Sequence, residues 1–277
     1  ATVWVSTPTW VNHVPLLGDA GLQLKEYPYY DSAAKGVNFA AMMETLESAS
    51  VGDLVLLHGC CHNPSGADLN REQWQSAAEL VARKGLIPFI DIAYQGLGDG
   101  LEEDAYGVRL MAQSVPEMIV ASSCSKNFGL YRERTGTVII ISENAERAAI
   151  SSSQLFSTIR GNYSMPPAHG AAIVETILDD SALDKLWRDE LSEMRERLAH
   201  NRRQLAAHIS AAGVSGRFDF ITAEKGMFSF LGISEREVDV LRDNYSIYMA
   251  GSSRINIAGI SEANVDYVAQ AIVKTIQ

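Results

Sequence analysis

Short apolar runs typical of buried strands recur along this chain and alternate with segments of helical periodicity. Five such runs stand out: Val3–Ser6, Leu54–His58, Leu86–Asp91, Met118–Ser122 and Thr137–Ile141. Residues 71–84 lie between two of these runs and carry apolar side chains on one helical face, namely Trp74, Ala77, Ala78 and Val81. Alternating strands and helices predict βαβ units, and therefore a mostly parallel sheet covered by helices. In such sheets, ligands bind at the carboxyl ends of the strands.

The pattern changes at a long charged segment of helical spacing, residues 181–212. Later strand-like pieces are shorter and mixed with helices: residues 218–222, 227–231, 247–249 and 255–257. Because a single core seldom grows beyond about 250–300 residues, a chain of 277 residues accommodates two unequal domains. We predict a large α/β domain over residues 1–193 and a small C-terminal α+β domain over residues 194–277.

The overall charge and the cysteine content limit the partners and the location of the protein. A net charge of −11 argues against a nucleic-acid partner, since phosphate binding needs clustered lysines and arginines. No apolar run approaches the ~20 residues of a membrane-spanning helix. The cysteines Cys60, Cys61 and Cys124 cannot form a disulfide framework, which favours a reducing compartment. We therefore expect a cytoplasmic protein that binds neither nucleic acid nor membranes.

A lysine among small hydroxyl residues follows the fourth apolar run, in the segment 122–127 (Ser-Ser-Cys-Ser-Lys-Asn). Desolvation and a nearby cation can lower the pKa of Lys126 and make it a carbonyl-reactive amine. The alternative is an exposed loop lysine. Eight residues later, Arg134 is suited to hold a phosphate dianion together with Ser123, through a charged fork and a hydroxyl donor. The alternative there is a merely basic loop.

Three further residues follow strand-like runs and have two interpretations each. Asp91 ends the third run, with Tyr94 close behind; its carboxylate can pair with a protonated ring nitrogen or cap the next helix. Asn63, in a turn with Pro-Ser-Gly, can donate to a ligand oxygen or form an Asx turn. Trp10 follows the first run, and its indole either packs in the core or stacks on an aromatic ligand.

Four side chains that can ligate a metal fall between His58 and His62. Structural zinc sites usually draw ligand pairs from two separate segments. No second cluster of histidine and cysteine exists in this sequence, because Cys124, His169 and His13 are scattered. We therefore expect no metal ion.

Two arginines are candidates for carboxylate binding. Arg254 follows Gly-Ser-Ser, whose small side chains leave room around a guanidinium, the natural bidentate partner of a carboxylate. Arg160 lies in a similar but less confined segment, residues 158–164. Each can instead be an exposed arginine without a ligand.

Taken in this order, the segments resemble the fold-type I, class I pyridoxal-phosphate-dependent aminotransferases of the aspartate/aromatic subgroup. The matching segments are residues 8–13, 62–66, 91–96, 123–134, 162–170, 226–230 and 253–259. They extend over almost the whole chain, and the segment around Lys126 is the most specific. The resemblance implies the large, mostly parallel sheet domain of that fold type with a smaller C-terminal domain, and pyridoxal 5'-phosphate as the cofactor.

The resemblance also implies a role for each residue around the cofactor ring. Lys126 would form a Schiff base with the cofactor and then act as general base and acid. Asp91 would keep the pyridinium nitrogen protonated, which makes the ring an electron sink. Tyr94 and Asn63 would hydrogen-bond the phenolate oxygen, and Trp10 would stack on the ring.

The remaining candidates would hold the phosphate and support the ring. Ser123 and Arg134 would take the phosphate group. His13 and His58 would stand behind Asp91.

The substrate residues implied by the resemblance are Arg254 and Arg160, with Trp10 and Asn63 beside them. Arg254 would clamp the α-carboxylate, and Arg160 would reach across a homodimer interface to the distal carboxylate of aspartate or glutamate. The implied activity is transfer of the amino group of aspartate to 2-oxoglutarate. The alternative is an aromatic amino-acid aminotransferase acting on tyrosine or phenylalanine, or a dual-specificity enzyme.

The sequence departs from the pattern of this subgroup in two places. The subgroup carries a segment ahead of the position of Ala1, with a Gly-Thr phosphate-binding turn and a tyrosine that reaches the neighbouring subunit's phosphate. The strand-like start of this chain suggests that upstream sequence is missing; without it, an inactive truncated form or a scaffold protein is the alternative. Met165 stands where aspartate-specific relatives often carry Asn, which would loosen a preference for dicarboxylates.

Overall fold

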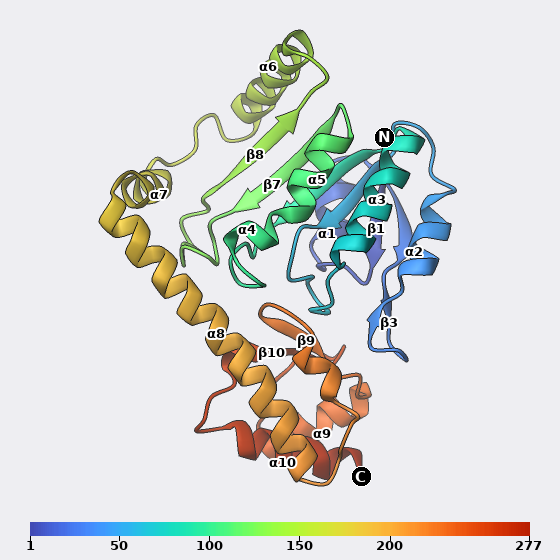
Figure 1. Ribbon diagram of the computed structural model, residues 1–277, viewed down its shortest axis with the longest axis vertical. Coiled ribbons are helices and arrows are strands. Elements are labelled where there is room, and N and C mark those ends of the chain that lie inside the picture. The colour runs from blue at the N-terminus through green and yellow to red at the C-terminus, as the bar shows by residue number, and fades with distance from the viewer.

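A six-stranded sheet forms the centre of the larger part of the molecule (Figure 1). The computed structural model describes all residues, 1–277. The strands lie in the order β2-β1-β5-β6-β7-β8, with bounds Gln23–Pro28, Thr2–Thr7, Leu54–His58, Ile87–Ile92, Met118–Ser123 and Gly136–Ile141. All neighbouring strands are parallel except β7 and β8, which are antiparallel. The expected mostly parallel sheet is therefore confirmed.

Helices connect the parallel strands of this sheet and pack on it. They are α1 (His13–Asp19), α2 (Phe39–Leu46), α3 (Arg71–Lys84), α4 (Leu101–Asp104) and α5 (Tyr106–Ser114). A small hairpin of β3 (Tyr30–Asp31) and β4 (Gly36–Val37) follows β2.

The predicted helix α3 shows how local signals set the bounds of an element. Asn70 caps its first turn by accepting a hydrogen bond from the backbone of Gln73, whose side chain returns the bond. Gly85 ends it in the left-handed conformation at φ 61°. The predicted apolar face is buried, and its Trp74 packs against Gly107 of α5, where a Cβ would lie 2.5 Å from the indole.

The sequence pattern does not predict strand β2, because its residues do not form an apolar run. It lies at the edge of the sheet, where Gln23, Lys25 and Glu26 face solvent and only Tyr27 is fully buried. Edge strands tolerate polar side chains that a central strand excludes.

After β8, the chain forms α6 (Ala145–Asn162) and α7 (His169–Asp179) and then enters the long helix α8 (Ser181–Ala211). The charged pattern predicted this helix correctly. Its 31 residues are about 46 Å long at 1.5 Å per residue. Figure 1 shows α8 running from α7 to the other end of the molecule.

The residues that we assign to the small domain, 194–277, pack around the second half of α8. They include α9 (Glu235–Tyr245), α10 (Val265–Ile276) and the antiparallel pair β9 (Phe228–Phe230) and β10 (Arg254–Asn256). The proposed boundary at residue 194 falls inside the continuous helix α8.

Four segments of this region were expected to form strands, and for two of them the prediction is wrong. The segment 218–222 mostly forms a 3-10 helix, Asp219–Thr222, because Phe218 and Ile221 stand three residues apart and are both fully buried. Residues 247–249 pair with no strand. No helix of the chain is both long enough and apolar enough to cross a membrane.

Candidate active site

A cavity of about 330 Å³ opens at the carboxyl ends of β5, β6 and β7. Its lining consists of Trp10, Leu16, His58, Cys60, Asn63, Asp91, Ala93, Tyr94, Ser123, Ser125, Lys126 and Arg134. All seven side chains predicted to bind the cofactor are in this lining: Trp10, Asn63, Asp91, Tyr94, Ser123, Lys126 and Arg134. The parallel ladder explains why they meet, since it places His58 opposite Asp91 and Asp91 opposite Ala121.

A chain of hydrogen bonds supports Asp91 from behind. His13 Nε2 lies 2.9 Å from Asp91 Oδ2, and Thr9 Oγ1 lies 2.8 Å from His13 Nδ1. The same Thr9 hydroxyl is 3.1 Å from His58 Nε2. The second carboxylate oxygen of Asp91, Oδ1, makes no hydrogen bond within the chain and remains available to a ligand. His13 therefore contacts Asp91 directly, and His58 is linked to it through Thr9 and His13.

The protonation state of Asp91 follows from two opposing effects. Burial raises the pKa of this carboxyl group, but the hydrogen bond from His13 and the nearby cationic groups outweigh burial. The net pKa lies below its ordinary value, so Asp91 stays ionised near neutral pH.

Lys126 and Tyr94 face each other across the cavity. Lys126 Nζ lies 4.7 Å from the centre of the Tyr94 ring. Desolvation, and then the charge of Arg134, lower the pKa of Lys126 against the opposing charge of Asp91. Burial raises the pKa of the Tyr94 phenol, with Asp91 acting in the same direction. The amine is therefore easier to deprotonate than an ordinary lysine, and the phenol stays protonated.

One end of the cavity carries hydroxyl groups and a guanidinium. Ser123 Oγ donates to Ser125 Oγ at 2.9 Å and accepts from the Ser125 backbone N–H at 3.1 Å. Arg134 is exposed, donates to the Tyr131 carbonyl at 3.0 Å and has a left-handed backbone at φ 54°. That conformation is uncommon for a residue with a Cβ, and such residues gather at functional sites.

Arg254 borders this cavity from the small domain, although it is not part of the lining. Its Nη1 donates to Asn63 Oδ1 at 3.1 Å, and its guanidinium lies 4.5 Å from the ring centre of Phe228. The Asn63 amide also reaches Tyr94 Oη at 3.5 Å. The polar contact joins residues 191 positions apart in the sequence.

The structure does not bring Arg160 into the cavity of the same chain. It is exposed on α6, and its Nη1 donates to Ser164 Oγ at 2.6 Å. Met165, next along the chain, is 76% exposed.

Sequence reasoning missed five side chains of this site. Leu16, Cys60, Ala93 and Ser125 line the cavity, and Thr9 bridges the two histidines. Thr9 and Ser125 are adjacent in sequence to Trp10 and Lys126. The sequence therefore predicts the correct segments but not these two residues. Leu16 stands on the first helix, where its exposure to the cavity has no sequence signal.

The rings of His58 and His62 pack on each other at 4.3 Å, and neither histidine joins the cluster formed by Cys60 and Cys61. His58 contacts Thr9, whereas His62 lies 3.2 Å from Ser6 Oγ and 2.8 Å from Ser65 Oγ. His62 is 1% exposed, and its ring stacks on Tyr29 at 4.1 Å. These histidines are therefore packed and hydrogen-bonded parts of the wall behind the cavity.

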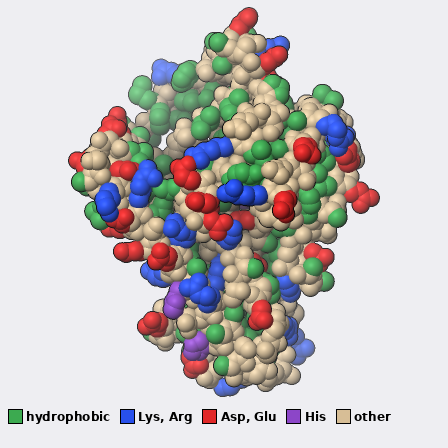
Figure 2. Space-filling view, viewed as in Figure 1, with side chains coloured by type: hydrophobic (Ala, Val, Ile, Leu, Met, Phe, Trp, Pro, Cys, Tyr) green, Lys and Arg blue, Asp and Glu red, His purple; other side chains and the backbone are tan.

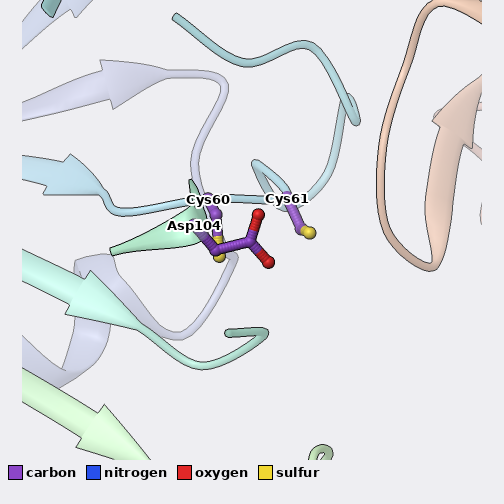
Figure 3. A group of neighbouring side chains, drawn as sticks. All are labelled: Cys60, Cys61 and Asp104. Carbon is purple, nitrogen blue, oxygen red and sulfur yellow. The ribbon is translucent and has the colours of Figure 1, made fainter. Parts of the chain in front are cut away.

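A different group gathers around the two adjacent cysteines. The side chains of Cys60, Cys61 and Asp104 are buried and offer ligand atoms within 4.8 Å of one another. In the view of Figure 3, the Asp104 carboxylate lies between the two sulfur atoms. That carboxylate already accepts three backbone N–H bonds, from Gly96, Gly98 and residue 99. Asp104 thereby fixes the turn between β6 and α4, and we assign it this structural role.

The segment that follows Lys126 is held by α8. Trp187 Nε1 donates to the Asn127 carbonyl at 2.8 Å, and its indole stacks on Phe128 at 4.3 Å. The Asn127 amide in turn donates to the Gln95 carbonyl at 3.2 Å. The residues directly after Lys126 are thus held by helix α8 through Trp187 and by the loop after β6 through Gln95.

Comparisons with known proteins agree with this site. The family model described as "Aminotransferase class I and II" matches residues 1–272. An aspartate aminotransferase of Haemophilus influenzae is 48% identical over 99% of this chain and 69% of its own length. An aromatic-amino-acid aminotransferase of Pseudomonas aeruginosa is 47% identical over 98% and 67%, respectively.

A solved structure is also similar to this chain. The aromatic-amino-acid aminotransferase of Burkholderia pseudomallei, covalently bound to pyridoxal phosphate, superposes with a TM-score of 0.98 at 44% identity. The match covers 100% of this chain and 69% of that chain. The chain therefore belongs to the class I and II aminotransferase family.

Proposed function

We propose that this cavity holds pyridoxal 5'-phosphate on Lys126 and that the protein transfers the amino group of aspartate to 2-oxoglutarate. One observation carries the proposal: seven side chains from four separated segments, all predicted from the sequence, line a single cavity at the edge of the sheet. The family membership and the relatives named aspartate aminotransferase support the same activity.

The donor and acceptor groups of the cavity fit the chemistry of this cofactor. Asp91 Oδ1 is an unpaired acceptor on an ionised carboxylate, as a protonated ring nitrogen requires. Ser123, Ser125 and Arg134 offer hydroxyl donors and a cation to a phosphate group. Trp10 is 36% exposed and offers an aromatic face.

The side chains contribute binding, orientation and proton transfer. When bound, the cofactor supplies the electron sink that the protein lacks. Lys126 Nζ, with its lowered pKa, accepts a proton as a base and returns it as an acid. Asp91 keeps its negative charge because His13 donates to it. Tyr94 Oη stays protonated, so it can donate a hydrogen bond to a ligand oxygen while it accepts one from the Asn63 amide.

The substrate carboxylate would bind to Arg254. Its guanidinium is restrained on two sides, by Asn63 and by the Phe228 ring, so a carboxylate meets a preoriented fork. We expect Arg254→Lys to raise KM for aspartate, because a lysine cannot reproduce the bidentate geometry.

We propose further that the protein is a cytoplasmic homodimer in which Arg160 serves the partner's site. Helix α6 has no buried residue, and large apolar side chains near Arg160 are exposed: Phe156 68%, Tyr163 52% and Met165 76%. Figure 2 shows hydrophobic side chains on the upper part of the molecule, where Figure 1 places α6 and β8. An apolar surface of this kind suits a second copy of the chain. The three free cysteines favour a reducing compartment. Sedimentation equilibrium gives twice the chain mass if the proposal holds.

The aromatic amino acids are the second candidate substrates. Relatives named aromatic-amino-acid aminotransferase are as similar as those named for aspartate, at 47% and 48% identity. Turnover of aspartate and of phenylalanine, each with 2-oxoglutarate, decides between them. A higher kcat/KM for phenylalanine would replace the aspartate assignment.

The catalytic assignment is tested by Lys126→Ala. Added pyridoxal phosphate should give wild-type protein the visible absorption band of the lysine-bound cofactor, and the variant should lack both this band and turnover. Lys185→Ala, at an exposed lysine of α8, is the matched control and should behave as wild type. If Lys126→Ala and wild type have the same spectrum, Lys126 does not carry the cofactor.

A further inference from the structure

Arg202 on α8 is one of the most buried side chains of the protein, at 2% exposure, although the charged pattern of this helix suggests a solvated position. The loop from residue 221 to residue 228 closes around its guanidinium. Nη1 donates to the Ile221 carbonyl at 3.1 Å and to the Glu224 carboxylate at 3.3 Å. The two N–H groups of Nη2 are shared among three carbonyl oxygens, those of Lys225, Gly226 and Phe228, at 3.0, 3.0 and 2.6 Å.

This arrangement is a poor source of stability. Burial lowers the pKa of Arg202 and raises the pKa of Glu224 to about 7, so desolvation acts against both charges. Arg202 Nε and Glu224 Oε1 are buried without a hydrogen-bond partner. A buried ion pair often contributes no more than an apolar pair of similar size. The guanidinium instead presents several N–H donors in a rigid planar arrangement, and these hold the carbonyl groups of the 221–228 loop in one conformation.

The loop that Arg202 shapes reaches the candidate active site from the small domain. Its Lys225 backbone N–H donates to the Gly66 carbonyl at 2.8 Å, in the turn that carries Asn63. A Cβ on Gly66 would lie 2.4 Å from the Phe228 carbonyl oxygen and 3.2 Å from Arg202 Nη2. The absence of a side chain at this left-handed position, φ 75°, therefore lets the loop and the turn touch.

The same loop ends in the residue that supports Arg254. Phe228 opens β9, and β9 pairs with the strand of Arg254 through Arg254–Phe230 and Asn256–Phe228. The Phe228 ring lies 4.5 Å from the Arg254 guanidinium and 6.2 Å from the Tyr94 ring, edge on. A shift of the loop would therefore move the support of Arg254 and the Asn63 turn together.

We propose that Arg202 is a positioning residue for substrate binding: it fixes the 221–228 loop against the Gly66 turn and so sets the orientation of Arg254. This inference rests on the proposed function, in which Arg254 binds the α-carboxylate of the substrate. Arg202 does not line the cavity, and it acts through Phe228 and Asn63.

The experiment compares holoenzyme variants of Arg202 with a neighbouring arginine. Arg202→Met removes the fork at similar length, and the double variant Arg202→Met/Glu224→Gln also removes the carboxylate that would be left unpaired. Arg203→Met is the matched control, since Arg203 is exposed on the next position of the same helix. Two readouts are measured: KM and kcat for aspartate, and the rise in thermal midpoint that propionate, a simple carboxylate, gives to each protein.

We expect the double variant to fold and to show KM raised by about tenfold, as a small displacement of a binding group would cause, with kcat changed much less. The rise in midpoint with propionate should be smaller than in wild type. Arg202→Lys should restore KM only in part, because it keeps the charge without the fork. Arg203→Met should match wild type in both readouts.

Two outcomes would overturn the inference and differ in what they say of the proposed function. If the double variant lowers only the thermal midpoint and leaves KM and the propionate effect unchanged, Arg202 is merely structural. In that case Arg254→Lys still raises KM, and the proposed function stands. If Arg254→Lys leaves KM unchanged as well, the proposed substrate site is wrong and the positioning role is wrong with it.

Discussion

The buried side chain of His62 should make the free energy of unfolding depend on pH. The ring is buried behind the candidate active site, between the hydroxyls of Ser6 and Ser65 and against Tyr29. Burial, and then the charge of His13, lower the pKa of His62 from 6.5 to about 3. In the unfolded chain the ring is solvated and keeps its ordinary pKa.

The sign of the effect on stability follows from proton binding. Below pH 6.5 the unfolded chain takes up a proton that folded His62 refuses, so acid favours unfolding until the pH falls through about 3. One pKa unit corresponds to about 1.36 kcal/mol, and the change from pH 7 to pH 5 therefore costs about 2 kcal/mol through this one group. Any folded pKa below about 4 gives the same value over this interval.

The assay is urea unfolding of wild type and His62→Gln at pH 7 and at pH 5, followed by tryptophan fluorescence. Glutamine does not titrate, so the loss of unfolding free energy between the two pH values should be about 2 kcal/mol smaller in the variant. The packing that is lost with the His62 ring lowers stability equally at both pH values. It therefore cancels when the unfolding free energy at pH 5 is subtracted from that at pH 7. His169→Gln, at an exposed histidine, should follow wild type. Equal pH dependence in wild type and His62→Gln would refute a neutral, buried His62.

Two further outcomes are expected. Asp91→Asn removes the charge that His13 supports, and we expect kcat to fall by at least about hundredfold with an unchanged far-UV spectrum; turnover within tenfold of wild type would contradict the role of Asp91. Gly107→Ala would place a Cβ 2.5 Å from the Trp74 indole, so urea unfolding should show a loss of about 1–3 kcal/mol. Gly18→Ala, in helix α1 with open space around it, is the control and should not lower stability.

The sequence predicted the centre of the sheet and the residues at its strand ends. The middle of strand β5 is buried on both sides, and β6 and β7 are buried on one side and half-buried on the other, so all three contain apolar runs whose polar ends mark the site. Asp91 and Ser123 could be chosen for this reason. The family resemblance then gave each residue a role that periodicity alone left open.

The remaining features depend on contacts between distant segments. Polar edge strand β2 carries no apolar run, and nothing in the helical pattern around Arg202 separates a buried arginine from a solvated one. Its burial depends on carbonyl groups of a loop that begins 19 residues later. The contact between Arg254 and Asn63 is likewise created by the packing of strand β10 against the turn that follows β5.

Helix α8 makes contacts near both ends of the catalytic apparatus. Through Trp187 it holds the segment after Lys126, and through Arg202 it holds the loop beneath Arg254. The helix therefore fixes both the distance and the relative orientation of Trp187 and Arg202. One residue inserted between them would rotate Arg202 relative to Trp187 by about 100° and move the two apart by about 1.5 Å. A hybrid protein that takes its two domains from different relatives would therefore have to join them within α8 without changing the helical register. The number of residues between Trp187 and Arg202 thus helps to determine the geometry of the candidate active site.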